Sequence, residues 1–334
     1  MIDFRSDTVT KPCNKMRDIM YHAPVGDDVY GDDESVNQLE AYARLRFNVA
    51  DALFCSSGTQ ANLLALMAHC ERGDEYICGQ SAHNYKFEGG GAAVLGSIQP
   101  QPIENEADGS LCFTKIAAAI KPDDSHFAKT RLLSLENTIG GKVLGIDYLI
   151  KAREFVDQHN LALHLDGARA FNAAAELNLD IKEITKHFDS VSICLSKGLG
   201  APVGSLLLGS EQLIAKARRW RKVLGGGMRQ AGMLAAAGQY ALENNTQRLV
   251  DDHANARYLA QQLSEISGFE VNISNTTNMV YATFDNNINI TKLAADLKAQ
   301  DIVFSPSKQL RLVTHLGITK ADIDTFIKAL TAHI

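Results

Sequence analysis

Short apolar runs alternate with helical patterns along much of the chain, and this alternation is the strongest constraint on the fold. The runs that predict buried strands are Ala93–Ile98, Leu132–Leu135, Leu161–Leu165, Ser190–Leu195 and Val203–Leu208. The segments that predict helices are residues 35–47, Thr59–His69, Phe113–Ile120 and Asp147–His159. Strands that alternate with helices are typical of an α/β fold with a mostly parallel sheet. Such sheets bind ligands beyond the carboxyl ends of their strands.

The pattern changes after three consecutive glycines at residues 225–227. The elements predicted after them are helices over Met228–Leu242 and Gln247–Glu265 and strands near Met279–Phe284 and Leu310–Thr314. We therefore predict a large domain over residues 1–244 and a smaller C-terminal domain over residues 245–334. The first dozen residues are expected to form an arm that packs with the small domain or with a partner subunit.

The composition excludes several classes of protein. The chain has 334 residues, 46% of them hydrophobic, and its net charge of -6 argues against nucleic-acid binding. Its six cysteines form no C-x-x-C pair, so neither a zinc site nor a redox dithiol is indicated, and we predict no metal. The N-terminus lacks a signal-peptide pattern, and no apolar window is long enough to span a membrane. We expect a cytoplasmic protein without a membrane partner.

Small residues precede the second predicted helix, at Ser57–Gly58–Thr59. A helix N-terminus offers free backbone N–H groups and the positive end of the helix dipole, so it attracts phosphate. Gly58 would let the backbone approach a ligand closely, and Thr59 adds a hydroxyl donor. Taken alone, however, the same residues are more typical of an ordinary helix cap.

Asp166 stands at the carboxyl end of an apolar strand. A carboxylate rarely lies against a core without a cationic partner. A protonated pyridine nitrogen would be such a partner, and holding that proton makes the ring a better electron sink. The alternative is an aspartate that forms a salt bridge or caps a turn.

The next apolar strand ends in Ser196–Lys197–Gly198. Burial or a nearby positive charge lowers the pKa of a lysine, and the neutral amine can then form an imine, although Lys197 could also extend into water. His83, between a strand and a helix, could stack on a flat ring and act as a base, although a lone histidine is more often structural. A phosphate site, an acid, a lysine and a histidine in this order together favour a pyridoxal-phosphate enzyme.

These motifs resemble those of the low-specificity L-threonine aldolases, a family of fold type I pyridoxal-phosphate enzymes. The matching stretches are Asp3–Thr10, Val25–Asp33, Gly58–Asn62, Leu165–Arg169, Cys194–Gly200, Gly225–Gln230 and Arg311–His315. The resemblance implies a mostly parallel seven-stranded sheet flanked by helices, a smaller C-terminal α+β domain and pyridoxal 5'-phosphate. It also implies a homotetramer, a dimer of dimers with shared active sites.

The resemblance further implies residue roles. Lys197 would form the Schiff base, Asp166 would pair with the pyridine nitrogen, and His83 would stack on the ring. The other implied cofactor contacts are Ser57, Gly58, Thr59, Arg169, Ser196, Lys222 and Arg229, the last two from a neighbouring subunit. The implied substrate contacts are Ser6, Tyr30, His83, His126, Arg169 and Arg311, with Tyr30 from the partner chain. His83 and His126 are the candidate bases. The basic run Arg218–Lys222 could instead be a solvated helix face.

The reaction that the resemblance implies is the cleavage of β-hydroxy-α-amino acids, L-threonine and L-allo-threonine, to glycine and an aldehyde. One loop departs from the family pattern, because Ile139–Gly140 stands where members often have His-Asn. The alternatives are an aminotransferase or β-eliminating lyase on the same fold, and a non-catalytic binding protein. A nucleotide-binding oxidoreductase is disfavoured, because no G-x-G-x-x-G opens a first βαβ unit.

Overall fold

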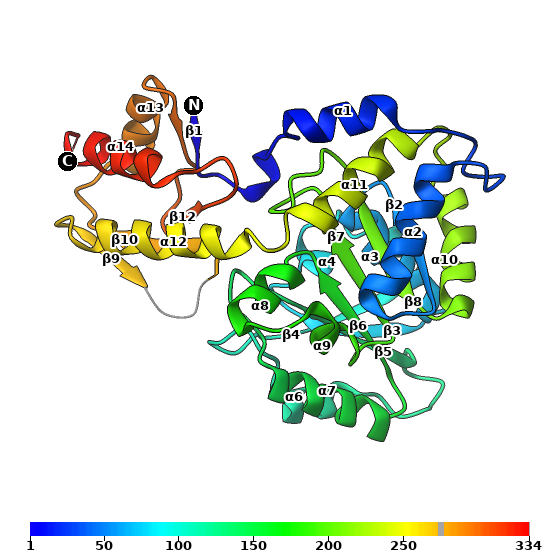
Figure 1. Ribbon diagram of the computed structural model, residues 1–334. Helices are drawn as coiled ribbons and strands as arrows, with labels where there is room; N and C mark the ends of the chain where they lie inside the picture. The colour runs from blue at the N-terminus through cyan, green and yellow to red at the C-terminus, as the bar shows by residue number, and fades with distance from the viewer. Residues whose placement is uncertain (273–276, 334) are drawn as a thin grey trace.

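A computed structural model describes residues 1–272 and 277–333. Its centre is a seven-stranded sheet with the strand order β2-β8-β7-β6-β5-β3-β4 (Figure 1). The strands are β2 (Asp51–Cys55), β3 (Glu75–Gly79), β4 (Gln99–Ile103), β5 (Thr130–Glu136), β6 (Ala162–Gly167), β7 (Ser190–Cys194) and β8 (Ser205–Gly209). Strand β8 runs antiparallel to both of its neighbours, and the other pairs are parallel. The predicted mostly parallel sheet is therefore confirmed.

Helices cover both faces of this sheet. They are α1 (Asn14–His22), α2 (Glu34–Phe47), α3 (Gly58–His69), α4 (His83–Lys86), α5 (Gly91–Val94), α6 (Phe113–Ala119), α7 (Ile146–Gln158), α8 (Ala170–Leu177), α9 (Ile181–Thr185), α10 (Glu211–Val223) and α11 (Gly232–Asn244). Because side chains alternate along a strand, Ala52 and Phe54 pack in the core on the side of α2, whereas Leu53 and Cys55 pack under α3 and α10.

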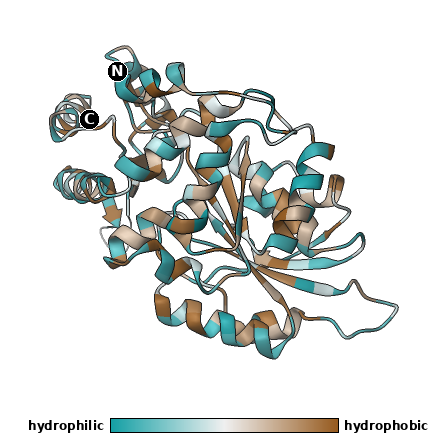
Figure 2. Cartoon of the chain, turned by 45° about the vertical axis from the view of Figure 1, so that its right-hand side comes forward, coloured by the Kyte–Doolittle hydropathy of each residue, from teal (hydrophilic) through white to brown (hydrophobic). Residues whose placement is uncertain are grey.

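The central strands are buried on both faces, which explains their continuous apolar runs. All five residues of β7 and all five of β8 are buried. Figure 2 shows these strands as largely hydrophobic and the surrounding helices as mixed in hydropathy. No helix within the described residues is long and apolar enough to span a membrane.

The C-terminal part has a core of its own. Its elements are α12 (Leu249–Ser264), β9 (Phe269–Asn272), β10 (Met279–Phe284), α13 (Ile290–Lys298), β11 (Ile302–Val303), β12 (Leu310–Val313) and α14 (Lys320–Thr331). β9, β10 and β12 form an antiparallel sheet, so this part is the predicted smaller α+β unit. The predicted boundary between residues 244 and 245 remains a prediction.

The N-terminal arm joins the two parts. Strand β1 (Ile2–Asp3) pairs in parallel with β11, and Phe4 is fully buried in the C-terminal core. A 3-10 helix, η1 (Asp7–Val9), then leads to α1 and the large sheet (Figure 1). Within the chain, the arm therefore packs with the small unit, which is one of the two predicted arrangements.

One predicted strand is wrong. Residues Ala93–Ile98 lie in α5 and the turn after it, and the strand is β4, which begins at Gln99. Val94 and Leu95 are exposed, so the apolar run is not a buried one. Strand β4 contains two prolines, Pro100 and Pro102, which an edge strand tolerates because its outer side needs no backbone donors.

Candidate active site

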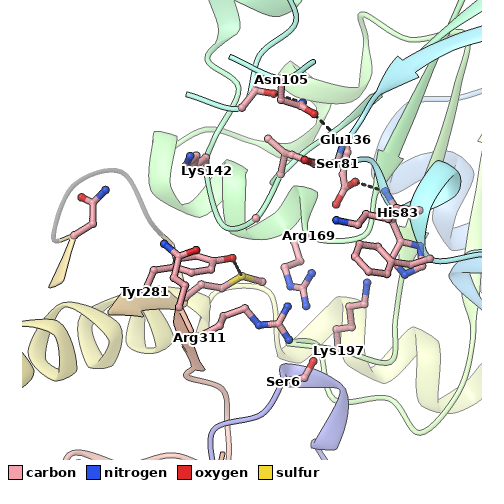
Figure 3. Close-up of a pocket in the computed structure, with 18 of the residues that line it drawn as sticks. Ser6, Ser81, His83, Asn105, Glu136, Lys142, Arg169, Lys197, Tyr281 and Arg311 are labelled. Atoms are coloured by element: carbon pink, nitrogen blue, oxygen red, sulfur yellow. Dashed lines mark hydrogen bonds between the residues drawn. The ribbon is translucent and has the colours of Figure 1, made fainter. Parts of the chain in front are cut away.

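A pocket of about 890 Å³ lies between the carboxyl ends of the parallel strands, the N-terminal arm and the C-terminal unit. It brings together Ser6, His83, Arg169, Lys197 and Arg311, all of which the sequence predicts for the site. Figure 3 shows Arg169, Lys197 and Arg311 pointing into the same space, with Ser6 beside them. The pocket therefore unites residues that are more than three hundred positions apart in the chain.

Lys197 and Asp166 come from adjacent strand ends. Lys197 follows β7, and its carbonyl oxygen accepts a hydrogen bond from the Thr10 hydroxyl at 2.9 Å, so the arm holds this loop. Asp166 lies near the end of β6 and is 3% exposed. Its Oδ1 accepts from the Ala168 N–H at 3.0 Å and its Oδ2 from the Asn62 side-chain amide at 2.7 Å.

Asp166 forms no ion pair with any of the described residues. A buried carboxylate without a cation is costly, so this environment suits a ligand that supplies a positive charge. A protonated pyridine nitrogen is such a group, and the amine of Lys197 lines the adjoining pocket. The residues therefore fit pyridoxal phosphate.

His83 is held by two glutamates. Its Nδ1 lies 2.8 Å from Glu88 Oε1, and its backbone N–H donates to Glu136 Oε2 at 2.8 Å. The hydrogen bond to Glu88 raises the pKa of His83, against the smaller effect of burial. Burial, and then the negative charge of Asp166, raise the pKa of Glu136 to about 8. Glu136 therefore takes up a proton at a higher pH than an ordinary glutamate does.

Arg169 forms a buried ion pair with Asp7 from the arm. Its Nε donates to Asp7 Oδ2 at 2.8 Å and its second terminal nitrogen to Oδ1 at 2.5 Å. Burial alone would raise the pKa of Asp7, but the charge of Arg169 and its hydrogen bonds hold that pKa below its ordinary value. The Ser6 hydroxyl caps η1 by accepting from the Thr8 N–H at 3.2 Å.

Arg311 lies on β12, opposite Tyr281 of β10. Its guanidinium donates to the Arg5 carbonyl oxygen at 3.1 Å. None of the described carboxylates forms an ion pair with Arg311, so its charge is available to an anionic ligand. The planar fork of a guanidinium matches a carboxylate. Tyr281 and Met279 lie beside it on the pocket wall.

The predicted phosphate site lies at the N-terminus of α3. The Ser57 hydroxyl caps this helix by accepting from the Gln60 N–H at 3.1 Å. A Cβ added to Gly58 would meet nothing within 4 Å, and Thr59 is exposed, so space is open above the first turn. This twelve-residue helix thus offers its first N–H groups to an anion. Ser196 lies in the segment that precedes Lys197, with its hydroxyl 3.6 Å from Cys194 Sγ.

The remaining predicted residues do not line this pocket within the described chain. His126 has a side chain that is 81% exposed, and it lies in the loop before β5, at the opposite end of the strand from Glu136. Tyr30 is 81% exposed, and Arg229 pairs with Asp27 at 3.4 Å. Lys222 lies in the last turn of α10.

Three of these residues share one region of the surface. A Cβ on Gly227 would stand 3.3 Å from Lys222 Cδ and 3.4 Å from the side chain of Val29, the neighbour of Tyr30. Gly226 lies against Gln60, in the first turn of α3. The end of α10 and the segment around Tyr30 therefore lie together, on the side of the chain's own predicted phosphate site.

The sequence predictions missed the acidic residues that support the site, namely Asp7, Glu88 and Glu136, and they also missed Asn62 and Tyr281. Asp7 and Asn62 stand inside stretches that resemble the family, so the sequence signal is present there without an assigned role. His83, Glu88 and Asp166 have ligand atoms within 4.8 Å of one another, a spacing that a metal could use. Asn62 donates to both carboxylates, which accounts for the cluster without an ion.

Comparisons with known proteins agree with this geometry. The family description "Beta-eliminating lyase" matches residues 3–287. The low specificity L-threonine aldolase of Escherichia coli K12 is 56% identical over 323 residues, which cover 97% of this chain and 96% of that protein. The low-specificity L-threonine aldolase 1 of Arabidopsis thaliana is 42% identical, with 96% and 93% covered. The chain belongs to the low-specificity threonine aldolase family.

Solved structures show the same fold. The threonine aldolase of Leishmania major superposes with a TM-score of 0.83 over 99% of both chains at 22% identity. An L-allo-threonine aldolase homologue from Listeria monocytogenes gives 0.80 over 98% of this chain and 97% of that one, at 19% identity. The predicted family, the fold, the lyase class and the pyridoxal-phosphate cofactor are therefore confirmed. The individual roles of the site residues remain predictions.

Proposed function

We propose that this chain cleaves β-hydroxy-α-amino acids, L-threonine and L-allo-threonine among them, to glycine and the corresponding aldehyde. The observation that carries the proposal is the convergence of Lys197, Arg169 and Arg311 on one pocket beside the buried Asp166. Pyridoxal phosphate, when bound, supplies a ring that can accept the electron pair of the broken carbon–carbon bond. Each residue acts by placing charge or by moving a proton.

Lys197 would hold the cofactor covalently and yield its place to the substrate amine. Asp166 would keep the ring nitrogen protonated. Ser57, Gly58 and Thr59 would bind the phosphate through the first turn of α3, with Ser196 close to the lysine.

Arg311, Arg169 and Ser6 would hold the substrate carboxylate. Fixing that end would hold the substrate in one orientation, with the Cα–Cβ bond that is to break placed for reaction. His83 would take the proton of the β-hydroxyl group, since its hydrogen bond to Glu88 orients the ring and stabilises the charge it gains.

The remaining predicted residues support a site that is shared between subunits. Tyr30, Lys222 and Arg229 lie in one exposed region, and His126 is exposed at the other end of the sheet. We propose that a second copy of the chain brings such residues to the pocket, in a homotetramer built as a dimer of dimers. A cytoplasmic location is proposed as well, in keeping with six cysteines that are all free.

The test is the identity of the product. Purified protein with pyridoxal phosphate should release acetaldehyde and glycine from L-threonine and from L-allo-threonine, measured side by side. The Lys197→Ala variant, which lacks the amine, should show neither turnover nor the visible absorption of a lysine-bound cofactor. Release of 2-oxobutanoate and ammonia instead would identify a β-eliminating lyase, and a colourless wild-type protein would exclude both reactions.

A further inference from the structure

A seam of polar side chains runs beneath α3, between this helix and strands β6 and β7. Its members are Asn62 and His69 on α3, His164 and Asp166 on β6, and Ser190 and Ser192 on β7. His164 is paired in register with Ser190, and Asp166 with Ser192, so these four side chains share one face of the sheet. Asn62 and His69 are seven positions apart, which puts them on one side of α3.

Hydrogen bonds join these side chains into one continuous network. His69 Nε2 lies 2.8 Å from Ser190 Oγ, and Ser190 Oγ lies 2.8 Å from His164 Nδ1. His164 Nε2 lies 3.3 Å from Asn62 Oδ1, and Asn62 Nδ2 lies 2.7 Å from Asp166 Oδ2. Asn62, His164, Asp166, Ser190 and Ser192 are each at most 3% exposed. Polar groups buried so deeply are costly unless every one is satisfied.

The carboxylates of Asp166 and Glu88 fix the orientation of the Asn62 amide. Its nitrogen donates to Asp166 Oδ2 at 2.7 Å and to Glu88 Oε1 at 2.9 Å, and these carboxylate oxygens accept. Its oxygen then faces the Ser192 hydroxyl at 2.7 Å and His164 Nε2 at 3.3 Å. Both hydrogens and both lone pairs of the amide are used, so the reversed amide would lose all four contacts.

This orientation also fixes the protons on the two histidines. His164 must carry its hydrogen on Nε2 in order to donate to Asn62. Burial lowers the pKa of His164 to about 3 and that of His69 to about 4, so both rings are neutral. The bare Nδ1 of His164 then accepts from the Ser190 hydroxyl, which in turn accepts from His69 Nε2–H. In each hydrogen bond of this network, from His69 to Asp166, the donated hydrogen points toward Asp166.

This series of hydrogen bonds does not carry protons to Asp166, because the Asn62 amide stands between His164 and Asp166 and an amide is a poor proton carrier. Its effect is to orient dipoles, and aligned hydrogen bonds strengthen one another. Its outer end, His69, lines a second cavity of about 520 Å³ at the other end of the sheet. At the inner end are the carboxylate of Glu88, which contacts His83, and that of Asp166, which would pair with the ring nitrogen of the bound cofactor.

We propose that His164 is a positioning residue for the cofactor acid. Held by Ser190 and His69, it keeps the Asn62 amide turned so that its nitrogen bridges Asp166 and Glu88. This inference rests on the proposed function, because the acid that is positioned serves the bound cofactor. None of the residues of the seam lines the pocket that holds Lys197 and Arg311.

The test uses two substitutions at position 164. His164→Leu removes both hydrogen bonds, whereas His164→Gln keeps a side-chain N–H that can reach Asn62. We expect His164→Leu to weaken pyridoxal phosphate binding and to lower kcat by about tenfold or more, with a smaller change in KM. The pH at which the visible absorption of the bound cofactor changes should shift in the Leu variant and return toward the wild-type value in the Gln variant.

A matched control separates positioning from loss of a buried ring. His187 is also buried and lies just before β7, but its ring Nε2 makes no hydrogen bond to the described residues, so His187→Leu should leave the absorption and its pH dependence unchanged. If His164→Leu does not fold, Ser190→Ala removes the donor to His164 and should change the same readouts in the same direction. Wild-type absorption behaviour in the folded variant overturns the inference.

A measurement without cofactor makes the two proposals distinguishable. Nitrogen-15 NMR of histidine-labelled protein should find His164 and His69 neutral, with the proton on Nε2, whether or not pyridoxal phosphate is present. A proton on Nδ1 of His164 would overturn the inference even in an active enzyme. Failure of the wild-type protein to bind the cofactor or to cleave threonine would overturn the proposed function instead, and the cofactor role of the seam with it.

Discussion

Arg169 and Asp7 form a two-pronged buried ion pair that ties the N-terminal arm to the end of β6. The two hydrogen bonds measure 2.8 Å and 2.5 Å, Asp7 is fully buried, and the Arg169 side chain is 12% exposed. Asn278 also donates to Asp7 Oδ2, at 3.4 Å. The pair therefore does two things: it fixes the arm on the sheet and sets the position of an arginine that faces the pocket.

Asp7→Asn is expected to destabilise the folded chain. The substitution leaves the Arg169 charge buried without a counter-charge, which typically costs about 3 to 5 kcal/mol. The free energy of unfolding in urea measures this loss. Asp180→Asn is the matched control, because Asp180 pairs with Arg46 at 3.0 Å on the surface and is 53% exposed, where such pairs contribute about 1 kcal/mol or less. Equal losses in the two variants would contradict the assigned importance of the pair.

Arg311→Ala is expected to raise KM for threonine with the cofactor still bound. A hydrogen bond to a charged group is worth about 1.5 to 3 kcal/mol, so KM should rise by about tenfold to a hundredfold. Steady-state kinetics and the visible absorption of the cofactor measure the two effects separately. Arg5→Ala is the control, because Arg5 is paired with Asp3 and its side chain does not line the pocket. Loss of cofactor from the Arg311 variant would show that Arg311 holds the cofactor and that its predicted role in binding the substrate carboxylate is wrong.

The sequence predicts those parts of the fold and site that depend on neighbours in the chain. Strands β7 and β8 are buried on both faces and so read as continuous apolar runs, whereas β4 carries two prolines and sits at an edge. Lys197 is predicted because it follows the end of an apolar strand, whereas Arg169 is predicted only from the family resemblance. The pairing of Arg169 with Asp7 spans 162 positions and has no local pattern that would reveal it.

Other parts of the site cannot be predicted from a single sequence, because they depend on contacts between distant segments or between subunits. Exposed His126 and Tyr30 gain a role only if a second copy meets the pocket, and no spacing within the sequence encodes that contact. The polar seam beneath α3 was also invisible, because Asn62 and His164 lie in segments that otherwise read as apolar. Asn62 and His164 find their hydrogen-bond partners only when α3 packs against β6.

Glu88→Gln is expected to move the acidic limb of kcat/KM to lower pH. The hydrogen bond to Glu88 raises the pKa of His83, and the neutral amide of glutamine would no longer stabilise the charged ring. A base works in its neutral form, so activity falls as the pH drops through the pKa of His83. A lower pKa therefore shifts this fall to lower pH. An unchanged acidic limb would show that a group other than His83 takes the β-hydroxyl proton. His126 is the other predicted candidate.

Glu136→Gln is expected to flatten the pH dependence of stability in the cofactor-free protein. Burial, and then the charge of Asp166, raise the pKa of Glu136 from 4.5 to about 8, so the folded chain binds a proton that the unfolded chain releases. The stability that this proton provides is complete below the unfolded pKa and is lost as the pH rises through the folded one. Glutamine mimics the protonated form and can still accept the His83 N–H.

The wild-type protein should therefore lose stability relative to Glu136→Gln as the pH is raised from about 5 to about 8. Urea denaturation of the two proteins at a series of pH values measures this difference. Glu106→Gln is the matched control, because Glu106 is 43% exposed, pairs with Lys115 and also lines the pocket, but is not deeply buried. Its curve should stay parallel to that of the wild type over this range. If Glu136→Gln also ran parallel to the wild type, the carboxyl would be ionised in the folded chain, and Glu136 would add a negative charge beside Asp166 at neutral pH.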